Sequence, residues 1–179
     1  MNNIYLSIVA ASRNDNHGNK LDERTNLFIK SIAENCKKYK IQTELLLVEW
    51  NQIPNTKTLN DRLKLISNEY LVSKILPVNQ EHHLKLPNSD RLHFFQMIAK
   101  NVGIRRASGK FILATNIDVI INQKLYEFIS NKNLKEKTIY RCDRHCVEYD
   151  YSGNIEDSHL DQFTNFIDRK YYSLDVKTN

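Results

Sequence analysis

Apolar and polar positions along this chain predict strands and helices in alternation. Nearly continuous apolar runs rich in β-branched residues cover 4–11 and 43–49, as expected of strands that are covered on both faces. Between them, apolar positions recur at helical spacing from about Asp22 to Lys38. The inner stripe of this helix is Leu21, Thr25, Phe28, Ile32 and Cys36. Strand, helix and strand together form a βαβ unit, in which the two strands pair in parallel.

The same alternation continues less cleanly to residue 149. It predicts further strands at 70–78, which Pro77 would end, and at 110–115 and 137–149. It predicts further helices within 58–69 and at 91–107 and 123–134. The expected core stripe of helix 91–107 is Leu92, Phe95, Ile98, Ala99 and Val102. Gly109, just past this helix, is a candidate for a left-handed cap.

This element order indicates one α/β domain, residues 1–179, with three layers (α/β/α) and a mainly parallel sheet. A length of 179 residues suits a single sizeable core. The net charge of +5 (26 − 21) fits a polyanionic ligand such as a nucleotide diphosphate, and it is equally compatible with ordinary solubility. The basic residues are scattered and form no block interleaved with aromatics, which argues against nucleic acid as a partner.

The amino terminus lacks the charged, apolar and cleavage regions of a signal peptide, and no transmembrane run is present, so we expect a cytoplasmic protein. An odd cysteine count (Cys36, Cys142, Cys146) argues for reduced thiols. Cys142, His145 and Cys146 could together ligate zinc, but no fourth ligand follows in a usual pattern. Cysteines that alternate on one strand face are the favoured interpretation.

Polar residues follow three of the predicted strands. They are Ser12, Arg13 and Asn14, then Glu49, Trp50 and Asn51, then Asn116 and Asp118. Open parallel sheets bind ligands beyond the carboxyl ends of their strands. Because side chains at i and i+2 of an extended segment share a face, we expect Asn116 and Asp118 to point into one crevice. Such residues are also common turn formers, so their convergence at one edge carries the prediction.

A carboxylate at this edge suits Mg²⁺ or Mn²⁺, which bridges substrate phosphates, and the Asn116 amide suits a ribose hydroxyl or a bound water. Asn101 and Arg105 lie four apart on the flank of helix 91–107, and we expect them to face the same crevice. The alternative for this pair is an ordinary amphipathic helix. Strand one is followed by no glycine-rich turn, and neither a phosphate loop of the Walker type nor a G-x-S-x-G elbow occurs.

Three segments resemble GT-A fold glycosyltransferases, especially the family 2-like enzymes of the nucleotide-diphospho-sugar transferase superfamily. NVGIRRASGKFILATNID (101–118) resembles their N-x-G-x-x-x-A-x-G segment with its later D-x-D motif. YLSIVAASRNDN (5–16) is similar to their first strand and nucleotide-facing loop, and ELLLVEWN (44–51) to their second strand. The resemblance covers about residues 4–145 and implies a Rossmann-like GT-A fold.

The resemblance also implies a nucleotide-diphosphate-sugar site and transfer of a hexosyl group to an unknown acceptor. The implied binding residues are Ala11, Ser12, Arg13, Asn14, Glu49, Asn51, Asn101, Arg105, Asn116 and Asp118. Asp118 would ligate Mn²⁺ or Mg²⁺, with Asn116 at the first D-x-D position. Asp143 is the nearest candidate for the base that deprotonates the acceptor, although it could instead pair with Arg141 or Arg144 on a strand.

The chain departs from the family pattern in three ways. Asn116 replaces the first aspartate of D-x-D, and VEWN replaces the more usual VDDGS. Only 61 residues (179 − 118) follow Asp118, so a donor-binding half at about 1–120 is followed by a short acceptor half at 121–179. The alternatives are therefore a transferase, a non-catalytic or truncated sugar-nucleotide-binding domain, and a nucleic-acid or protein interaction module. A partner chain or an oligomer could complete the acceptor site.

Overall fold

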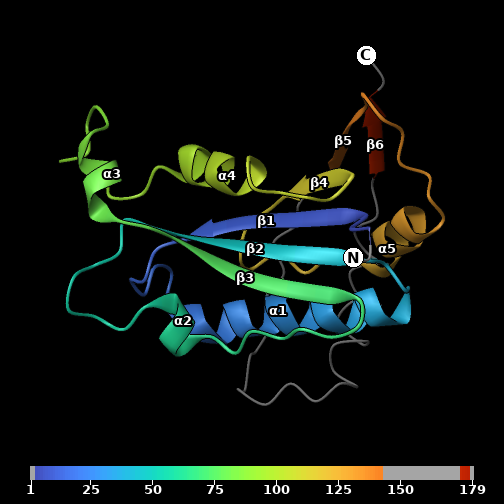
Figure 1. Ribbon diagram of the computed structural model, residues 1–179, viewed down its shortest axis with the longest axis horizontal. Coiled ribbons are helices and arrows are strands. Elements are labelled where there is room, and N and C mark those ends of the chain that lie inside the picture. The colour runs from blue at the N-terminus through green and yellow to red at the C-terminus, as the bar shows by residue number, and fades with distance from the viewer. Residues whose placement is uncertain (1–2, 143–173, 178–179) are drawn as a thin grey trace.

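A four-stranded parallel sheet forms the centre of the fold (Figure 1). The computed structural model describes residues 3–142 and 174–177. The strands are β1 (Leu6–Ser12), β2 (Thr43–Trp50), β3 (Leu71–Val78) and β4 (Phe111–Ala114), and they lie in the order β3-β2-β1-β4. The chain thus moves outward from β1 to β3 and then returns to the other side of β1. All three strand pairs are parallel, as the sequence predicts.

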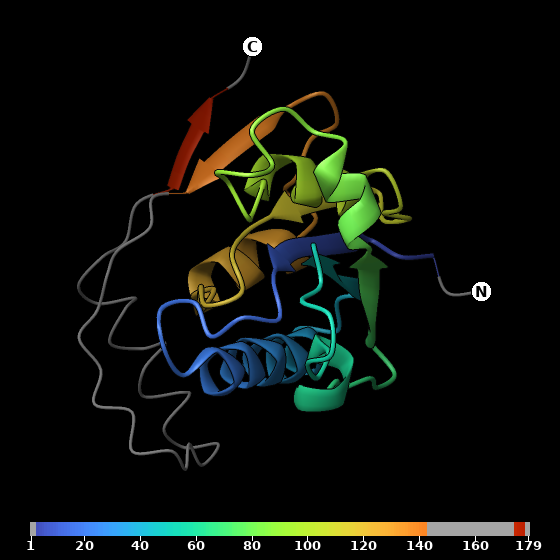
Figure 2. The ribbon, with the colours of Figure 1, turned by 90° about the vertical axis from the view of Figure 1, so that its left-hand side faces the viewer.

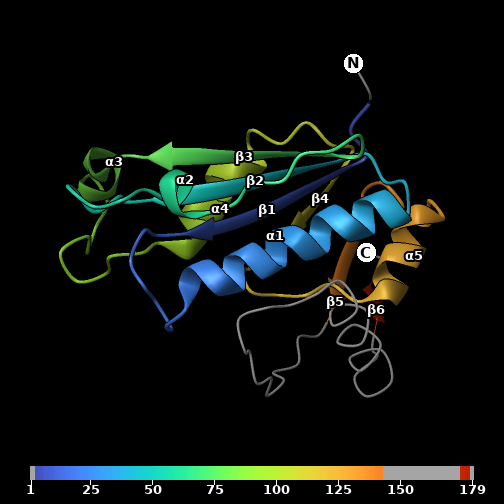
Figure 3. The ribbon, with the colours of Figure 1, turned by 90° about the horizontal axis from the view of Figure 1, so that it is seen from below.

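Helices cover both faces of the sheet (Figures 1 and 3). Helices α1 (Leu21–Lys38) and α5 (Gln123–Ser130) lie on one face, and α4 (Gln96–Ile104) lies on the other. Two short helices, α2 (Leu59–Arg62) and α3 (Gln80–Leu84), lie in the connections before and after β3. The described residues therefore form the α/β sandwich of three layers that the sequence predicts, an arrangement compatible with a Rossmann-like fold.

The main core lies between the sheet and the helices α1 and α5. The whole predicted stripe of α1 is buried: Leu21, Thr25, Phe28, Ile32 and Cys36. Strands β1 and β2 are buried along their full length, because helices cover both of their faces. Each large aliphatic or aromatic side chain buried here contributes about 1.5–3 kcal/mol through removal of apolar surface from water.

The helix expected at 91–107 is shorter than predicted and is rotated differently. It begins at Gln96 and ends at Ile104, and Leu92 (53% exposed) and Ile98 (39%) lie outside the core. Ala99 of the predicted stripe is buried, Phe95 and Val102 pack partly buried against the same core cluster, and Gly103 also faces the sheet. A Cβ atom at Gly103 would lie 2.5 Å from Cγ1 of Val9, so glycine permits a close approach of α4 to β1. This contact, together with Ala99, determines the rotation of the helix.

The expectation of a left-handed cap at Gly109 is wrong. Among the described glycines, Gly18 is the one with a positive φ. The reason for glycine at position 109 is a close backbone approach, since a Cβ atom there would lie 2.5 Å from Ser7 Oγ and 2.7 Å from Ser7 N. Gly109 N donates to Ser7 Oγ at 2.8 Å.

The amino ends of the parallel strands form one edge of the sheet, the amino edge, and Glu44 is a buried carboxylate there. Its Oε1 accepts from Ser7 Oγ at 2.6 Å and from both the backbone N–H and the hydroxyl of Ser108. Burial alone would raise the pKa of Glu44, but the hydrogen bonds from Ser7 and Ser108 outweigh it and hold the pKa below its usual value. The carboxylate therefore fastens the turn between α4 and β4 to the sheet.

Several element ends differ from the predictions. The helix within 58–69 has only four residues, and a short helix, α3, follows β3. Pro77 lies inside β3 and does not end it, because among the described strands β3 pairs with β2 alone and an N–H missing from the outer side of an edge strand breaks no ladder bond. The helix expected at 123–134 ends at Ser130.

The predicted fifth strand does not join the main sheet in the described residues. Instead, β5 (Ile139–Cys142) pairs antiparallel with β6 (Leu174–Lys177) in a separate two-stranded sheet. Cys36 is buried and Cys142 is exposed, and neither forms a disulfide. His145 and Cys146 lie outside the described residues. Within the described part of the chain, no helix is both long and apolar enough to cross a membrane.

Candidate functional site

The carboxyl ends of the parallel strands meet at one edge of the sheet, which faces the viewer in Figure 2. The strand order reverses between β1 and β4 at this edge, because β2 lies on one side of β1 and β4 on the other. Ligands of open α/β sheets bind at such a reversal. The loops after β1, β2 and β4 therefore define the candidate site.

Asn14, in the loop after β1, is committed to contacts within the protein. It is only 4% exposed. Its Nδ2 donates to Thr56 Oγ1 at 2.7 Å, and its Oδ1 accepts from Ile53 N at 2.8 Å. Asn14 thus joins the loop after β1 to the loop after β2. Its side chain supports the shape of the site and offers little to a ligand.

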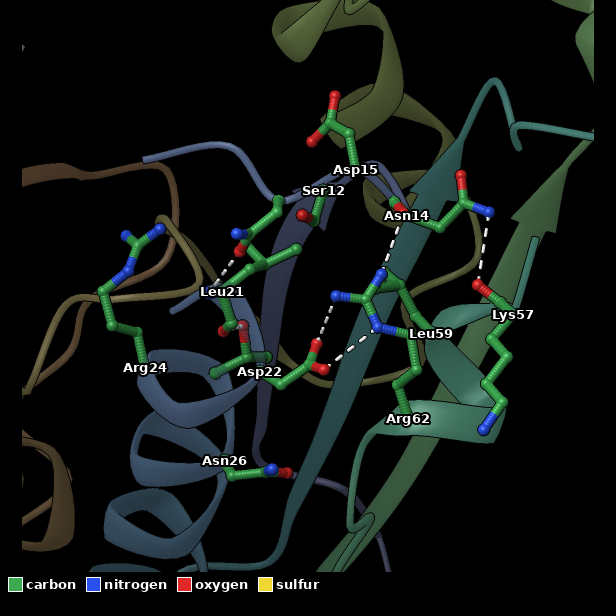
Figure 4. A network of polar contacts seen from close by, with 12 residues as sticks. Ser12, Asn14, Asp15, Leu21, Asp22, Arg24, Asn26, Lys57, Leu59 and Arg62 are labelled. Atoms are coloured by element: carbon green, nitrogen blue, oxygen red, sulfur yellow. Dashed lines mark hydrogen bonds and ion pairs between the residues drawn. The ribbon is translucent and has the colours of Figure 1, made fainter. Parts of the chain in front are cut away.

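Arg62 of α2 ties the same loop to helix α1 (Figure 4). Its guanidinium contacts both carboxylate oxygens of Asp22, with Nε to Oδ2 at 3.0 Å and Nη2 to Oδ1 at 2.8 Å. Its Nη1 donates to the carbonyl oxygen of Asn14 at 2.8 Å. Of the two contacts with Asp22, the first is a hydrogen bond and the second an ion pair, so Asp22 holds the guanidinium in position beside the loop. In Figure 4, Arg24 lies on the other side of the first turns of α1.

Glu49, at the end of β2, is buried, with 1% of its surface exposed. Its Oε1 accepts from Leu59 N at 2.7 Å and its Oε2 from Gln52 Nε2 at 2.6 Å. The carboxylate therefore binds the first residue of α2, where a negative charge also suits the helix end. Both oxygens already have donors from the protein.

Asn51 and Arg13 hold the loop after β2 in place. Asn51 has a positive φ of 50°, its N donates to Val78 O at 3.0 Å, and its Nδ2 donates to His93 O at 2.8 Å. Its carbonyl oxygen accepts from Arg13 Nε at 2.9 Å. Arg13 also pairs with Asp15 at 3.5 Å. Among the described residues, the buried Oδ1 of Asn51 has no donor.

Ala11 and Ser12 complete the end of β1 and are both buried. Ser12 Oγ donates to the carbonyl oxygen of Arg13 at 3.3 Å. These two residues place the loop that carries Arg13 beside the strand reversal. Ala11 and Ser12 therefore contribute to the site by positioning its backbone.

Asn116, after β4, contacts helix α4. Its Oδ1 accepts from Gln96 Nε2 at 2.9 Å and from Lys100 Nζ at 2.8 Å. Gln96 and Lys100 lie four apart, so they stand on one flank of the helix. The amide oxygen of Asn116 is thus already bound by an ammonium group.

Asp118 contacts helix α1. Its Oδ2 lies 2.5 Å from Arg24 Nη1, and the two side chains are 37% and 31% exposed. Arg24 also donates from Nε to Asn19 O at 3.0 Å and from Nη2 to His17 O at 2.6 Å. Arg24 therefore links the loop after β1 to the loop after β4, next to the strand reversal.

The expectation that Asn116 and Asp118 point into one crevice is wrong in its geometry. Strand β4 ends at Ala114, and the chain turns at Ile117 and Asp118, so the two-residue period of an extended strand does not apply. Ile117 is buried. Asn116 turns toward α4 and Asp118 toward α1, helices that cover opposite faces of the sheet.

The expectation for Asn101 and Arg105 is also wrong in its geometry. Both residues are exposed, and the flank of α4 that reaches the loop after β4 carries Gln96 and Lys100. Arg105 follows the last residue of α4, and the chain from there leads to the start of β4 at the opposite, amino edge of the sheet. The contacts of Gly103 with the sheet set this rotation. Asp143, the candidate base, lies outside the described residues.

Sequence reasoning missed Arg24 and Lys100. Gln96 and Lys100 are four residues apart, as are Asn101 and Arg105, so spacing alone does not tell which pair faces the loop after β4. The rotation of α4 in the structure decides between them. No local signal marks Arg24, which lies 94 residues before its partner Asp118. Within residues 3–142 and 174–177, no group of three or more His, Cys, Asp or Glu side chains is arranged to hold a metal ion.

Comparison of the chain with protein-family models, with curated proteins and with solved structures finds no match. At the carboxyl edge of the sheet, Arg13, Arg24 and Lys100 bring positive charge to the loops beside the strand reversal, and Arg62 contacts the loop after β1.

Proposed function

We propose that this chain binds a nucleotide diphosphate sugar at the carboxyl edge between β1 and β4 and acts as a glycosyltransferase of the hexosyltransferase type. The observation that supports this most is the reversal of strand order between β1 and β4, with Arg24 and Lys100 beside it. The resemblance of 101–118 to the GT-A segment supports the sugar nucleotide as the ligand class.

In the proposed reaction, an acceptor hydroxyl attacks the anomeric carbon of the sugar while the bond to the diphosphate breaks. The negative charge that develops on the leaving diphosphate would be offset by cations held in place at the edge. The acceptor proton passes to a carboxylate base, for which Asp143 remains the candidate from the sequence.

The expected Mn²⁺ or Mg²⁺ at Asp118 stays a prediction, and the side chains around Asp118 fit it poorly. The two residues at the D-x-D positions already contact cations, since Asp118 pairs with Arg24 and the Asn116 oxygen accepts from Lys100. A hard divalent cation prefers anionic or neutral oxygen ligands without competing positive charge.

A thermal-shift screen tests the proposed function. The purified chain is heated with UDP, GDP, ADP, CDP and their common sugar conjugates, each with EDTA and with Mn²⁺. A ligand at about 100 times its Kd should stabilise the folded protein by about 2.7 kcal/mol, which is readily measured as a rise in Tm. If no nucleotide raises the Tm under either condition, the proposal is wrong.

A second measurement separates a transferase from a binding domain. Release of free nucleotide on addition of sugar acceptors supports transfer. Stable binding of an intact sugar nucleotide without release supports the non-catalytic alternative, in which donor binding serves another purpose. Positioning of the acceptor decides between them, because a displacement of about 1 Å can cost about 100-fold in rate.

A further inference from the structure

We infer that Arg24 and Lys100 bind the diphosphate in place of a divalent cation, so that donor binding by this chain does not require a metal ion. This inference rests on the proposed function, because it concerns the same ligand at the same edge. It comes from the contacts of Asn116 and Asp118, each of which has a cationic side chain as its partner.

Arg24 is held in place independently of Asp118. A guanidinium has five N–H donors. In the described structure Arg24 uses one for Asn19 O, one for His17 O and one for Asp118, which leaves two N–H groups for a ligand. The two backbone carbonyls thus hold the guanidinium through contacts that do not involve Asp118. Its planar fork matches phosphate oxygens well.

Lys100 supplies the second positive charge. Its Nζ lies 2.8 Å from Asn116 Oδ1, to which Gln96 also donates. A metal ion bound to that oxygen would need a distance of about 2.0–2.2 Å and would therefore lie beside the ammonium group, where like charges repel. A phosphate oxygen has the opposite charge and would be attracted to the same ammonium group.

The two cations flank the same short segment of chain. Asn116 and Asp118 are two residues apart, which limits the separation of their Cα atoms to about 7 Å. Lys100 approaches this segment from α4 and Arg24 from α1, on opposite faces of the sheet. The inference therefore requires two linked phosphoryl groups at the reversal between β1 and β4 to span the segment between these two cations.

Asp118 has different roles in the two modes of binding, and this makes the inference testable. In binding through a metal ion, Asp118 is a ligand, and its loss abolishes nucleotide binding. In binding through Arg24, Asp118 competes with the phosphate for the guanidinium, so its neutralisation leaves binding unchanged or makes it tighter. Asp118→Asn therefore distinguishes the two modes, because it abolishes nucleotide binding through a metal ion and preserves or tightens binding through Arg24.

The experiment is isothermal titration of UDP, GDP, ADP and inorganic pyrophosphate into five proteins, with EDTA and again with Mn²⁺. The proteins are the unmodified chain and the variants Arg24→Gln, Lys100→Gln, Asp118→Asn and Lys20→Gln. Lys20 is the matched control, because this cation adjoins α1 but is 60% exposed and pairs only loosely with Glu23 at 3.7 Å. Circular dichroism and Tm show whether each variant is folded.

We expect at least one nucleoside diphosphate to bind in EDTA, with a Kd that Mn²⁺ changes by less than about threefold. Arg24→Gln and Lys100→Gln should each weaken binding about tenfold or more, because each removes a charge-assisted hydrogen bond to phosphate. Lys20→Gln should leave the Kd unchanged, and Asp118→Asn should leave it unchanged or lower it. If Arg24→Gln fails to fold, Lys100→Gln and Asp118→Asn still test the inference.

Two results would overturn the inference, and they differ in what they say of the proposed function. Binding that needs Mn²⁺ and is lost in Asp118→Asn would show a metal site, which leaves the proposed function intact. Absence of binding by every nucleotide, with and without Mn²⁺, would remove both the inference and the proposed function.

Discussion

The two edges of the parallel sheet each hold a carboxylate in a set of polar contacts, and the donors in the two sets differ. At the amino edge, Glu44 is buried and accepts from hydroxyl and backbone N–H groups of Ser7 and Ser108. At the carboxyl edge, Asp118 is partly exposed and pairs with Arg24, a cation with donors to spare. Neutral donors that surround a buried anion leave nothing for a ligand, so the first set stabilises the fold. A partly exposed cation can exchange its partner, so the second set can bind an anion.

Glu44→Ala should have one of the two largest effects and should act on stability alone. The substitution leaves the buried hydroxyl of Ser7 without its acceptor and removes the acceptor of the Ser108 backbone N–H, and we expect the free energy of unfolding to fall by about 3 kcal/mol. Urea unfolding measures this loss. Glu23→Ala, which removes an exposed carboxylate, is the control and should change stability by less than about 0.5 kcal/mol. A loss below about 1 kcal/mol for Glu44→Ala would contradict the structural role.

Gly109→Ala should have an effect of similar size, with a loss of about 3 kcal/mol. The new methyl group would meet the backbone nitrogen of Ser7 at 2.7 Å, and backbone cannot move aside cheaply. Gly103→Ala is the matched comparison, because its methyl group would first meet a methyl group of the buried Val9 side chain and not backbone. We expect a loss of about 1–2 kcal/mol there. Equal losses at the two positions would mean that the amino edge is less closely packed than the contacts indicate.

Glu49→Ala tests whether a buried carboxylate at the carboxyl edge behaves like Glu44. It should cost about 2 kcal/mol, since Leu59 N and the Gln52 amide lose their acceptor. Because both oxygens of Glu49 are bound within the protein, the Kd for a nucleoside diphosphate should change by less than about twofold. Titration calorimetry provides the check. A tenfold higher Kd would show that Glu49 contributes to the ligand site, contrary to its assigned role in the fold.

Protonation of Glu44 at low pH should lower the free energy of unfolding by less than these substitutions do. The pKa of Glu44 in the folded state lies below its ordinary value of 4.5, so the folded protein binds this proton less readily than the unfolded chain. The contribution is fully present above pH 4.5 and is lost as the pH falls through the lowered pKa of the folded state. Urea unfolding at pH 7 to 3 measures the loss. Glu44→Gln should show a shallower fall than the unmodified chain, and parallel curves would contradict the assignment.

The sequence predicted most of the fold because its strongest signals are local. The apolar runs of β1 and β2 and the inner stripe of α1 repeat at the periods of a strand and a helix. The βαβ connection then requires parallel pairing. The signal weakened wherever an element was short, as in α2 and α3, because a few residues carry too little periodicity to determine their type.

The two glycines within 101–118 mark positions of close packing, which the sequence alone does not show. Gly103 lets α4 approach β1, and Gly109 lets the turn before β4 pass against Ser7. Both positions report close packing at α4 and the amino edge, and neither lies in the loops of the candidate site. A motif that resembles a functional segment can therefore record the packing that places β4 beside β1.

The sequence by itself determined the order of the elements, the parallel sheet and the edge at which polar loops gather, because each follows from local periodicity and chain connectivity. Only the tertiary structure decided which side chains meet at that edge. The rotation of α4, set by Ala99 and Gly103, brought Lys100 to Asn116 in place of Asn101 or Arg105. The pairing of Arg24 with Asp118 joins residues 94 positions apart, and no local pattern encodes a contact that depends on how a helix and a loop pack across the sheet.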